Sequence, residues 1–146
     1  MESKKIIFYF SEHHNNTEKL IQEAAEGYQL EKVPSAITDV SKYDYIGFAS
    51  GIYWGVFGEK LTQHIDKLTG LKGKKCFSIC TSGSGSSGYV TAPKSGIEKK
   101  GGEFIGGFSC EGFDTYGMFG VIGGIKKGHP DKTDVENCKK FLNSLK

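Results

Sequence analysis

The sequence predicts an α/β fold with an open parallel sheet, and three observations support this. Apolar runs typical of strands alternate five times with segments whose apolar residues recur at helical spacing. The strand runs show little apolar–polar alternation, which is typical of strands covered on both faces. Polar loops follow three of the strands. Because parallel strands end at one edge, these loops should converge where such sheets bind ligands.

The first half of the chain contains three predicted strands and two predicted helices. The strands are expected at residues 4–10, 31–38 and 45–49, and the helices at 17–28 and 57–68. Pro34 interrupts the second strand. Because proline cannot donate to a strand ladder, we expect that strand at an edge of the sheet.

The second half predicts two more strands, at residues 75–81 and 102–109. A helix is expected at 90–100, although Pro93 and Gly96 weaken it, and the last helix should begin at 129–131. Residues 111–130 are rich in glycine and aromatic residues and fit no periodic template.

Composition limits the classes of protein that this chain can represent. Its 146 residues are expected to form a single domain spanning 1–146. A net charge of +2, with lysine pairs dispersed along the chain and no arginine, argues against a nucleic-acid partner. Neither a membrane span nor a secretory signal is recognisable, so we expect a cytoplasmic protein without a membrane partner. The four cysteines lack C-x-x-C spacing, and we expect buried, reduced thiols and no metal site.

The loop between the first strand and the first helix favours an anion site. A helix that follows such a loop directs unpaired N–H groups and the positive end of its dipole at the loop. Most of its polar side chains can donate hydrogen bonds: Ser11, His13, His14, Asn15, Asn16 and Thr17. The alternative is a plain turn, in which Asn15 or Asn16 caps the helix and Glu18 completes a capping box.

Two further loops complete the candidate site. The second contains Ser50, Gly51, Ile52, Tyr53, Trp54 and Gly55, whose adjacent aromatic rings can stack on a flat ligand. The third begins with Thr81, Ser82, Gly83, Ser84 and Gly85, where the backbone can approach a polar ring edge. Together the three loops predict a phosphorylated planar heterocycle as the ligand.

The first loop also carries a family resemblance. Flavodoxins hold the phosphate of FMN in a T/S-x-T-G-N-T type loop, and this chain has Ser-Glu-His-His-Asn-Asn-Thr at residues 11–17. Ser11 matches the start of that loop and Asn16-Thr17 its end, while His14 and Asn15 replace the usual threonine and glycine. The chain resembles the flavodoxin family over nearly its whole length, as a variant with paired histidines. The resemblance implies a three-layer sandwich, a five-stranded parallel sheet in the order 2-1-3-4-5, and one non-covalent FMN.

The resemblance also implies roles for the three loops. The donors of the first loop would hold the phosphate, and Tyr53 or Trp54 would stack on the isoalloxazine ring. Backbone groups at 50–51 and 82–85 would bond the ring edge. Residues 111–130 are a hypothetical cover, with Phe113, Tyr116 or Phe119 over the ring; a surface excursion or dimer contact is an equal alternative. We expect structural roles for His64 and His129, and solvated side chains for Glu12, Glu59 and Asp114.

Three functions follow from this interpretation. The first is a low-potential electron carrier of the flavodoxin type, with a redox partner protein, acting as a monomer or weak homodimer. The second is an FMN-dependent reductase that passes electrons from a nicotinamide donor to a quinone or another small acceptor. Flavodoxins are usually strongly acidic, so the net charge of +2 favours the reductase, as does the extra segment at 111–130, whereas the short chain favours the carrier. The third is a flavin-free module with the same fold.

Overall fold

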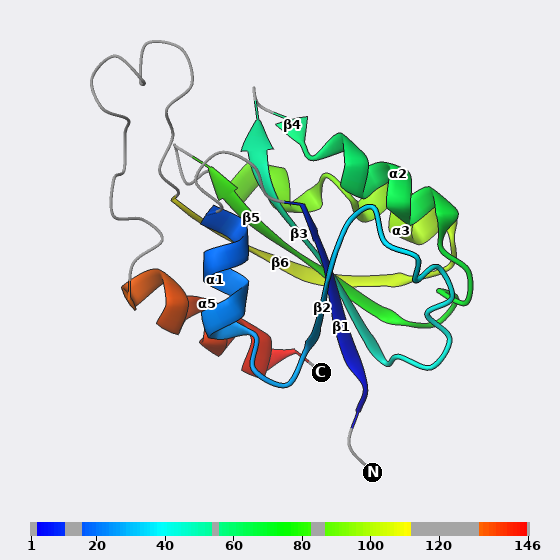
Figure 1. The fold of residues 1–146 in the computed structure, drawn as a ribbon, viewed down its shortest axis with the longest axis horizontal. Coiled ribbons are helices and arrows are strands. Elements are labelled where there is room, and N and C mark those ends of the chain that lie inside the picture. Colours follow the sequence, from blue (N-terminus) through cyan, green and yellow to red (C-terminus); the bar gives the residue numbers. More distant parts are fainter. Residues whose placement is uncertain (1–2, 11–15, 54–55, 83–86, 112–131, 146) are drawn as a thin grey trace.

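A computed structural model of the chain describes residues 3–10, 16–53, 56–82, 87–111 and 132–145. Its strands are β1 (Lys5–Phe10), β2 (Gln29–Lys32), β3 (Tyr45–Tyr53), β4 (Val56–Phe57), β5 (Lys75–Ser82) and β6 (Glu103–Glu111). Its helices are α1 (Asn16–Ala24), α2 (Glu59–Lys67), the 3₁₀ helix η1 (Ser87–Thr91), α3 (Lys94–Lys99) and α5 (Lys132–Ser144). Figure 1 shows α1 and α5 over one face of the sheet, and α2 and α3 over the other.

The sheet has the predicted topology. Its parallel strands follow the order β2-β1-β3-β5-β6, which is 2-1-3-4-5 when only the parallel strands are counted. The edge position predicted for the second strand is confirmed, because β2 pairs with β1 alone. The strand is shorter than predicted and ends before Pro34, whose ring nitrogen cannot donate to β1.

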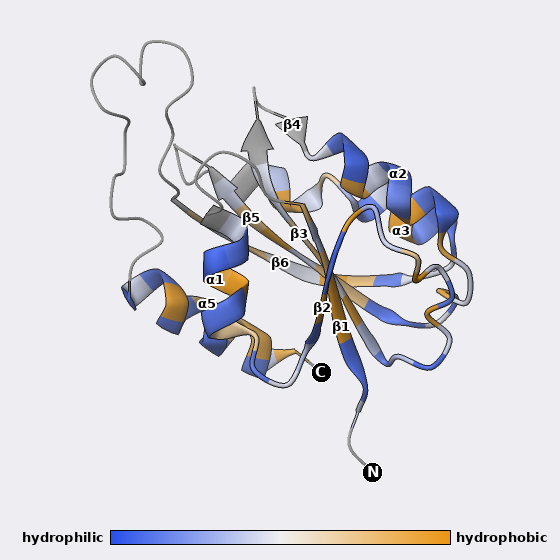
Figure 2. Ribbon diagram, viewed as in Figure 1, coloured by the Kyte–Doolittle hydropathy of each residue, from blue (hydrophilic) through white to orange (hydrophobic). Residues whose placement is uncertain are grey.

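Two apolar layers explain why the strand runs lack alternation. In β1, Ile6 and Phe8 pack into the layer beneath α2 and α3, whereas Ile7 and Tyr9 pack into the layer beneath α1 and α5. All four residues are buried. Figure 2 shows this apolar interior beside helices whose outer surfaces are hydrophilic. Burial on both faces makes the strand apolar throughout, as expected for a covered parallel sheet.

Two helices differ from their predicted bounds, one near a glycine and the other at a proline. α1 ends at Ala24, and Gly27 beyond it has a φ of +89°, a conformation that favours glycine. The helix predicted over 90–100 is two pieces, η1 and α3, with Pro93 at the N-cap of α3. Because proline lacks a backbone donor, it begins a helix more readily than it continues one.

The cysteine prediction is confirmed, since all four thiols are free and buried. Cys76 and Cys80 lie in one apolar layer, and Cys110 and Cys138 lie in the other. His64 is structural, as expected: its ring is buried against Phe8, with ring centroids 4.8 Å apart, and its Nε2–H donates to the Ile37 carbonyl at 2.9 Å. Glu59 is exposed. Within the described ranges, none of the helices has the length and apolar character needed to cross a membrane.

Candidate functional site

The carboxyl ends of the three central strands lie at one edge of the sheet. Phe10, the last residue of β1, is in register with Ser50 of β3, and Gly51 is in register with Thr81 of β5. One end of α1 lies at the same end of the molecule as the arrowheads of β3 and β5 (Figure 1). The predicted convergence of the three loops is therefore supported at the strand ends from which they leave.

A buried pair of hydroxyl groups links two of these elements. Thr17, in the first turn of α1, and Thr81, near the end of β5, have their Oγ1 atoms 2.9 Å apart. Thr17 is fully buried and Thr81 is 2 % exposed. Whichever hydroxyl donates to the other, the acceptor retains a hydrogen of its own. This Thr17–Thr81 pair therefore fixes the start of α1 to β5 and leaves one O–H for a further acceptor.

Ser50 fastens β3 to the segment that begins α2. Its fully buried hydroxyl donates to the Gly51 carbonyl at 2.6 Å and accepts the Gly58 N–H at 3.0 Å. A Cβ on Gly58 would lie 2.6 Å from Ser50 Oγ and 3.0 Å from a ring carbon of Phe10, so only glycine fits without movement. The Ser50 side chain thus shapes the strand ends, and its hydroxyl is already hydrogen-bonded both as a donor and as an acceptor within the protein.

The second predicted loop begins later than expected. β3 continues through residues 50–53, and Ile52 and Tyr53 pair in antiparallel fashion with Phe57 and Val56 of β4. Sequence reasoning assigned residues 50–55 to a loop and Phe57 to a helix; the loop assignment is wrong for residues 50–53, and the helix assignment is wrong for Phe57. The reason is that two residues are too few to show a strand pattern, and the pairing depends on a partner already in the sheet. Tyr53 consequently ends a strand, with its backbone position fixed by that pairing.

Charged groups flank this edge. Lys60 of α2 lies with its Nζ 5.6 Å from the centroid of the Phe10 ring, which places a cation beside the end of β1. Sequence reasoning missed Lys60, although a lysine in the first turn of the helix after the second loop was a usable signal. Glu18 in the first turn of α1 accepts a hydrogen bond from the Tyr9 hydroxyl at 3.0 Å. Burial, and next this carboxylate, raise the pKa of Tyr9, which keeps the phenol neutral.

The remaining predicted site residues divide into two groups. Asn16, Ile52, Tyr53 and Ser82 are placed by their backbones, at the start of α1, in β3 and in β5. Nine lie outside the described residues: Ser11, His13, His14, Asn15, Trp54, Gly55, Gly83, Ser84 and Gly85. The hypothetical cover is also outside them from residue 112 onward, as are Glu12, Asp114 and His129. Among the described residues, no three His, Cys, Asp or Glu side chains form a group that could hold a metal ion.

Comparison with solved structures shows the fold class directly. Flavodoxin 2 of Bacillus cereus superposes with a TM-score of 0.64 at 18% identity, covering 95% of each chain. An FMN-bound flavodoxin of Fusobacterium nucleatum superposes with a TM-score of 0.64 at 11% identity, over 98% of this chain and 99% of that one. General stress protein 14 of Treponema denticola, in complex with FMN, gives 0.61 at 12% identity, over 97% and 99%. Identities this low establish a shared fold and no more.

A curated protein is much closer in sequence. An uncharacterized protein of Methanocaldococcus jannaschii is 36% identical over 149 residues, an alignment that covers 97% of each chain. No family model matches the chain. The alignment with this relative covers nearly the whole chain, and the solved structures share the fold of that chain. The chain therefore belongs to one sequence family with its Methanocaldococcus relative, and it has the flavodoxin-like fold.

Proposed function

We propose that the protein binds FMN at the carboxyl edge of its sheet and carries electrons between partner proteins. The observation that supports this most is the Thr17–Thr81 pair, which joins the start of α1 to β5 at the edge where β1 and β3 also end. Structural relatives with FMN bound share the fold.

The described residues fit a flavin phosphate on one side and a polar ring edge on the other. The first turn of α1 supplies backbone N–H groups, and the spare hydrogen of the Thr17–Thr81 pair supplies a hydroxyl donor. Backbone at 50–51 and the end of β5 would face the ring edge. Lys60 adds a positive charge that attracts the phosphate. When bound, the flavin supplies the redox chemistry, and the chain binds and orients it.

A reductase that takes electrons from a nicotinamide cofactor is the second candidate. The net charge of +2 and the position of Lys60 favour an anionic small-molecule donor over a basic partner protein. Both candidates require FMN, so the first experiment is common to them.

The experiment is a titration of the purified chain with FMN, followed by absorbance and fluorescence. We expect a shifted flavin spectrum and quenched fluorescence, with weaker binding of riboflavin, which lacks the phosphate. Thr17→Val should weaken FMN binding, whereas Thr62→Val, which removes a helix hydroxyl that donates to the Glu59 carbonyl, should not. No spectral change with either flavin would refute the proposal.

Stepwise anaerobic reduction then separates the two candidates. Uptake of electrons in two separate one-electron stages supports the carrier. Reduction in a single two-electron stage, together with oxidation of added NADH or NADPH, supports the reductase.

A further inference from the structure

The amino ends of the strands carry lysines at the edge opposite the candidate site. Residues Lys5 of β1, Tyr45 of β3 and Lys75 of β5 are in register across three adjacent strands. The pairs Lys4-Lys5 and Lys74-Lys75, far apart in the sequence, therefore meet at one edge. Since β1 is six residues long, this edge lies roughly 15–20 Å from the candidate FMN site.

Several of these lysines are held in place by neighbouring groups. Lys5 Nζ lies 5.3 Å from the Tyr28 ring centroid and 5.9 Å from that of Tyr45. Lys75 Nζ lies 5.7 Å from the same Tyr45 ring. Lys74 Nζ donates to the Ser41 carbonyl at 2.7 Å. Cations placed in advance lose less conformational entropy when a ligand binds them.

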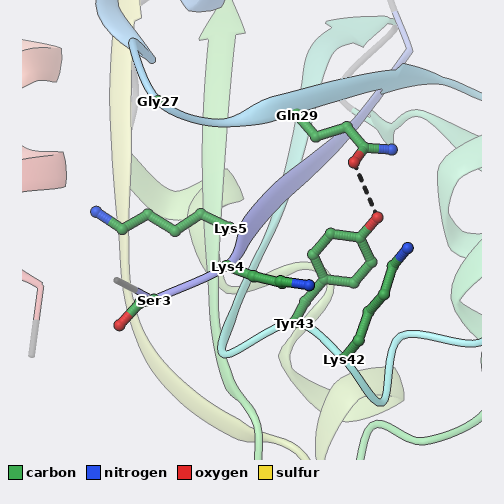
Figure 3. Close-up of a pocket in the computed structure, with 7 residues that line it drawn as sticks. All are labelled: Ser3, Lys4, Lys5, Gly27, Gln29, Lys42 and Tyr43. Carbon is green, nitrogen blue, oxygen red and sulfur yellow. Dashed lines mark hydrogen bonds between the residues drawn. The ribbon is translucent and has the colours of Figure 1, made fainter. Parts of the chain in front are cut away.

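A hollow of about 340 Å³ opens among three of the lysines (Figure 3). The described residues that line it are Ser3, Lys4, Lys5, Gly27, Gln29, Lys42 and Tyr43, and none of these carries a carboxylate. The Tyr43 hydroxyl donates to Gln29 Oε1 at 2.9 Å, and Lys42 Nζ lies 5.4 Å from the Tyr43 ring centroid. In Figure 3, Lys4 extends toward Tyr43 and Lys5 extends the other way. The positive charges thus stand on two sides of the hollow.

A second hollow, of about 290 Å³, shares Ser3 with the first and adds Lys74 and Lys75. Its carboxylate, Asp44, accepts the backbone N–H of Lys4 at 3.0 Å. The two ion pairs found among the described residues, Lys94–Glu98 and Lys139–Glu136, lie on α3 and α5. Among the described residues, therefore, none of the lysines of this edge forms an ion pair with a carboxylate.

We propose that this lysine edge, defined by Lys4, Lys5, Lys42, Lys74 and Lys75, binds the polyphosphate chain of a small molecule. Ammonium groups bind phosphate as point charges, without the planar geometry that arginine offers to carboxylates. Because Lys4 and Lys5 extend in opposite directions (Figure 3), a chain of two or three phosphates can contact more of these ammonium groups at once than a single phosphate can. The volume of the first hollow lies in the range of small-molecule sites. This inference does not depend on FMN binding.

The test is a calorimetric and NMR titration of the full chain with inorganic tripolyphosphate at low salt, without and then with FMN. We expect amide shifts at Ser3, Gly27 and Gln29, and about fivefold weaker binding in Lys4→Gln/Lys42→Gln. The matched control, Lys67→Gln/Lys99→Gln, removes the same charge from exposed positions on α2 and α3 and should stay within about twofold of the parent, because charge at a distance is screened.

Equal weakening in both variants, no binding at all, or shifts confined to residues 11–17 would each overturn the proposal. A parallel titration with ATP identifies the source of the phosphates. Tighter binding of ATP than of tripolyphosphate supports a nucleotide, and equal affinity supports a phosphate chain alone. If the parent chain binds tripolyphosphate but does not bind FMN, the proposed function is refuted and this inference is not.

Discussion

Thr17 and Thr81 are 64 positions apart in the chain, yet their hydroxyls share a hydrogen bond with almost no access to solvent. A buried hydroxyl that loses its partner keeps its desolvation cost, whereas replacing both partners by apolar groups of the same shape removes that cost. The pair is therefore energetically coupled. The coupling can be measured without reference to a ligand.

We expect Thr81→Val to lower the free energy of unfolding by about 1–3 kcal/mol, because the Thr17 hydroxyl stays buried and unpaired. The double variant Thr17→Val/Thr81→Val should be less destabilised than the sum of the two single variants. Urea unfolding of the parent, both single variants and the double variant measures this cycle. Additive losses would show that the two hydroxyls do not depend on each other.

His64 gives a prediction about pH. Burial lowers the pKa of its imidazole, the hydrogen bond to Ile37 opposes this, and the charge of Lys67 lowers the pKa further. The folded chain consequently binds fewer protons at this site than the unfolded chain does. The contribution of His64 to stability should be complete above about pH 6.5 and decline as the pH falls toward the lowered folded pKa.

The comparison with His64→Gln isolates that contribution from the other histidines. We expect the stability difference between parent and variant to narrow as the pH is lowered from about 7.5 to about 5. Urea unfolding at several pH values measures it. A difference that is constant over this range, or that widens in acid, would contradict the prediction.

At the scale of elements, β3 lies between β1 and β5. Where side chains of those two strands approach each other across β3, only a residue without a side chain fits. A Cβ on Gly47 would overlap the Phe77 ring and lie 3.0 Å from Ile7 Cγ1. Gly96 in α3 is different, since a Cβ there would meet Ile65 Cγ2 at an ordinary 3.5 Å. The two glycines thus offer a matched pair of Gly→Ala substitutions.

Gly47→Ala should lower the free energy of unfolding by about 1–3 kcal/mol, because the added methyl forces ring and strand apart. Gly96→Ala should raise it by up to about 1 kcal/mol, because alanine favours a helix over glycine. Thermal and urea unfolding of both variants tests this. Equal effects of the same sign would mean that crowding in β3 is relieved by small movements.

The elements also show what a sequence reveals about a fold. The apolar runs at β1, β3 and β5 predicted buried strands because covering both faces leaves a continuous apolar pattern. Pro34 correctly predicted that β2 lies at the edge of the sheet, because a proline cannot donate a backbone hydrogen bond wherever its neighbours lie. β4 and η1 were missed because a two-residue strand and a single 3₁₀ turn depend on contacts with distant segments. The Thr17–Thr81 pair was missed for the same reason, although each threonine was separately placed in the candidate site.

At the scale of the whole molecule, the cysteines report on both apolar layers at once. Cys76 and Cys80 lie beneath α2 and α3, and Cys138 of α5 lies on the other side of the sheet. Burial raises the pKa of each of these three thiols to about 12. The thiolate is the reactive form, so at pH 8 its population is about a thousandfold smaller than in an ordinary cysteine.

We therefore expect a thiol-specific reagent at pH 8 to label the folded chain only as fast as the chain opens. Full denaturation should expose all four thiols at once, since none is in a disulfide. Mass spectrometry of peptides digested from the chain over a labelling time course, repeated at low urea concentrations, gives the rate for each cysteine. Labelling of Cys76, Cys80 and Cys138 at one common rate that rises with urea indicates global opening, because both layers must separate together. Faster labelling of Cys138 than of Cys76 would instead show that α5 detaches while the sheet and its other layer remain folded.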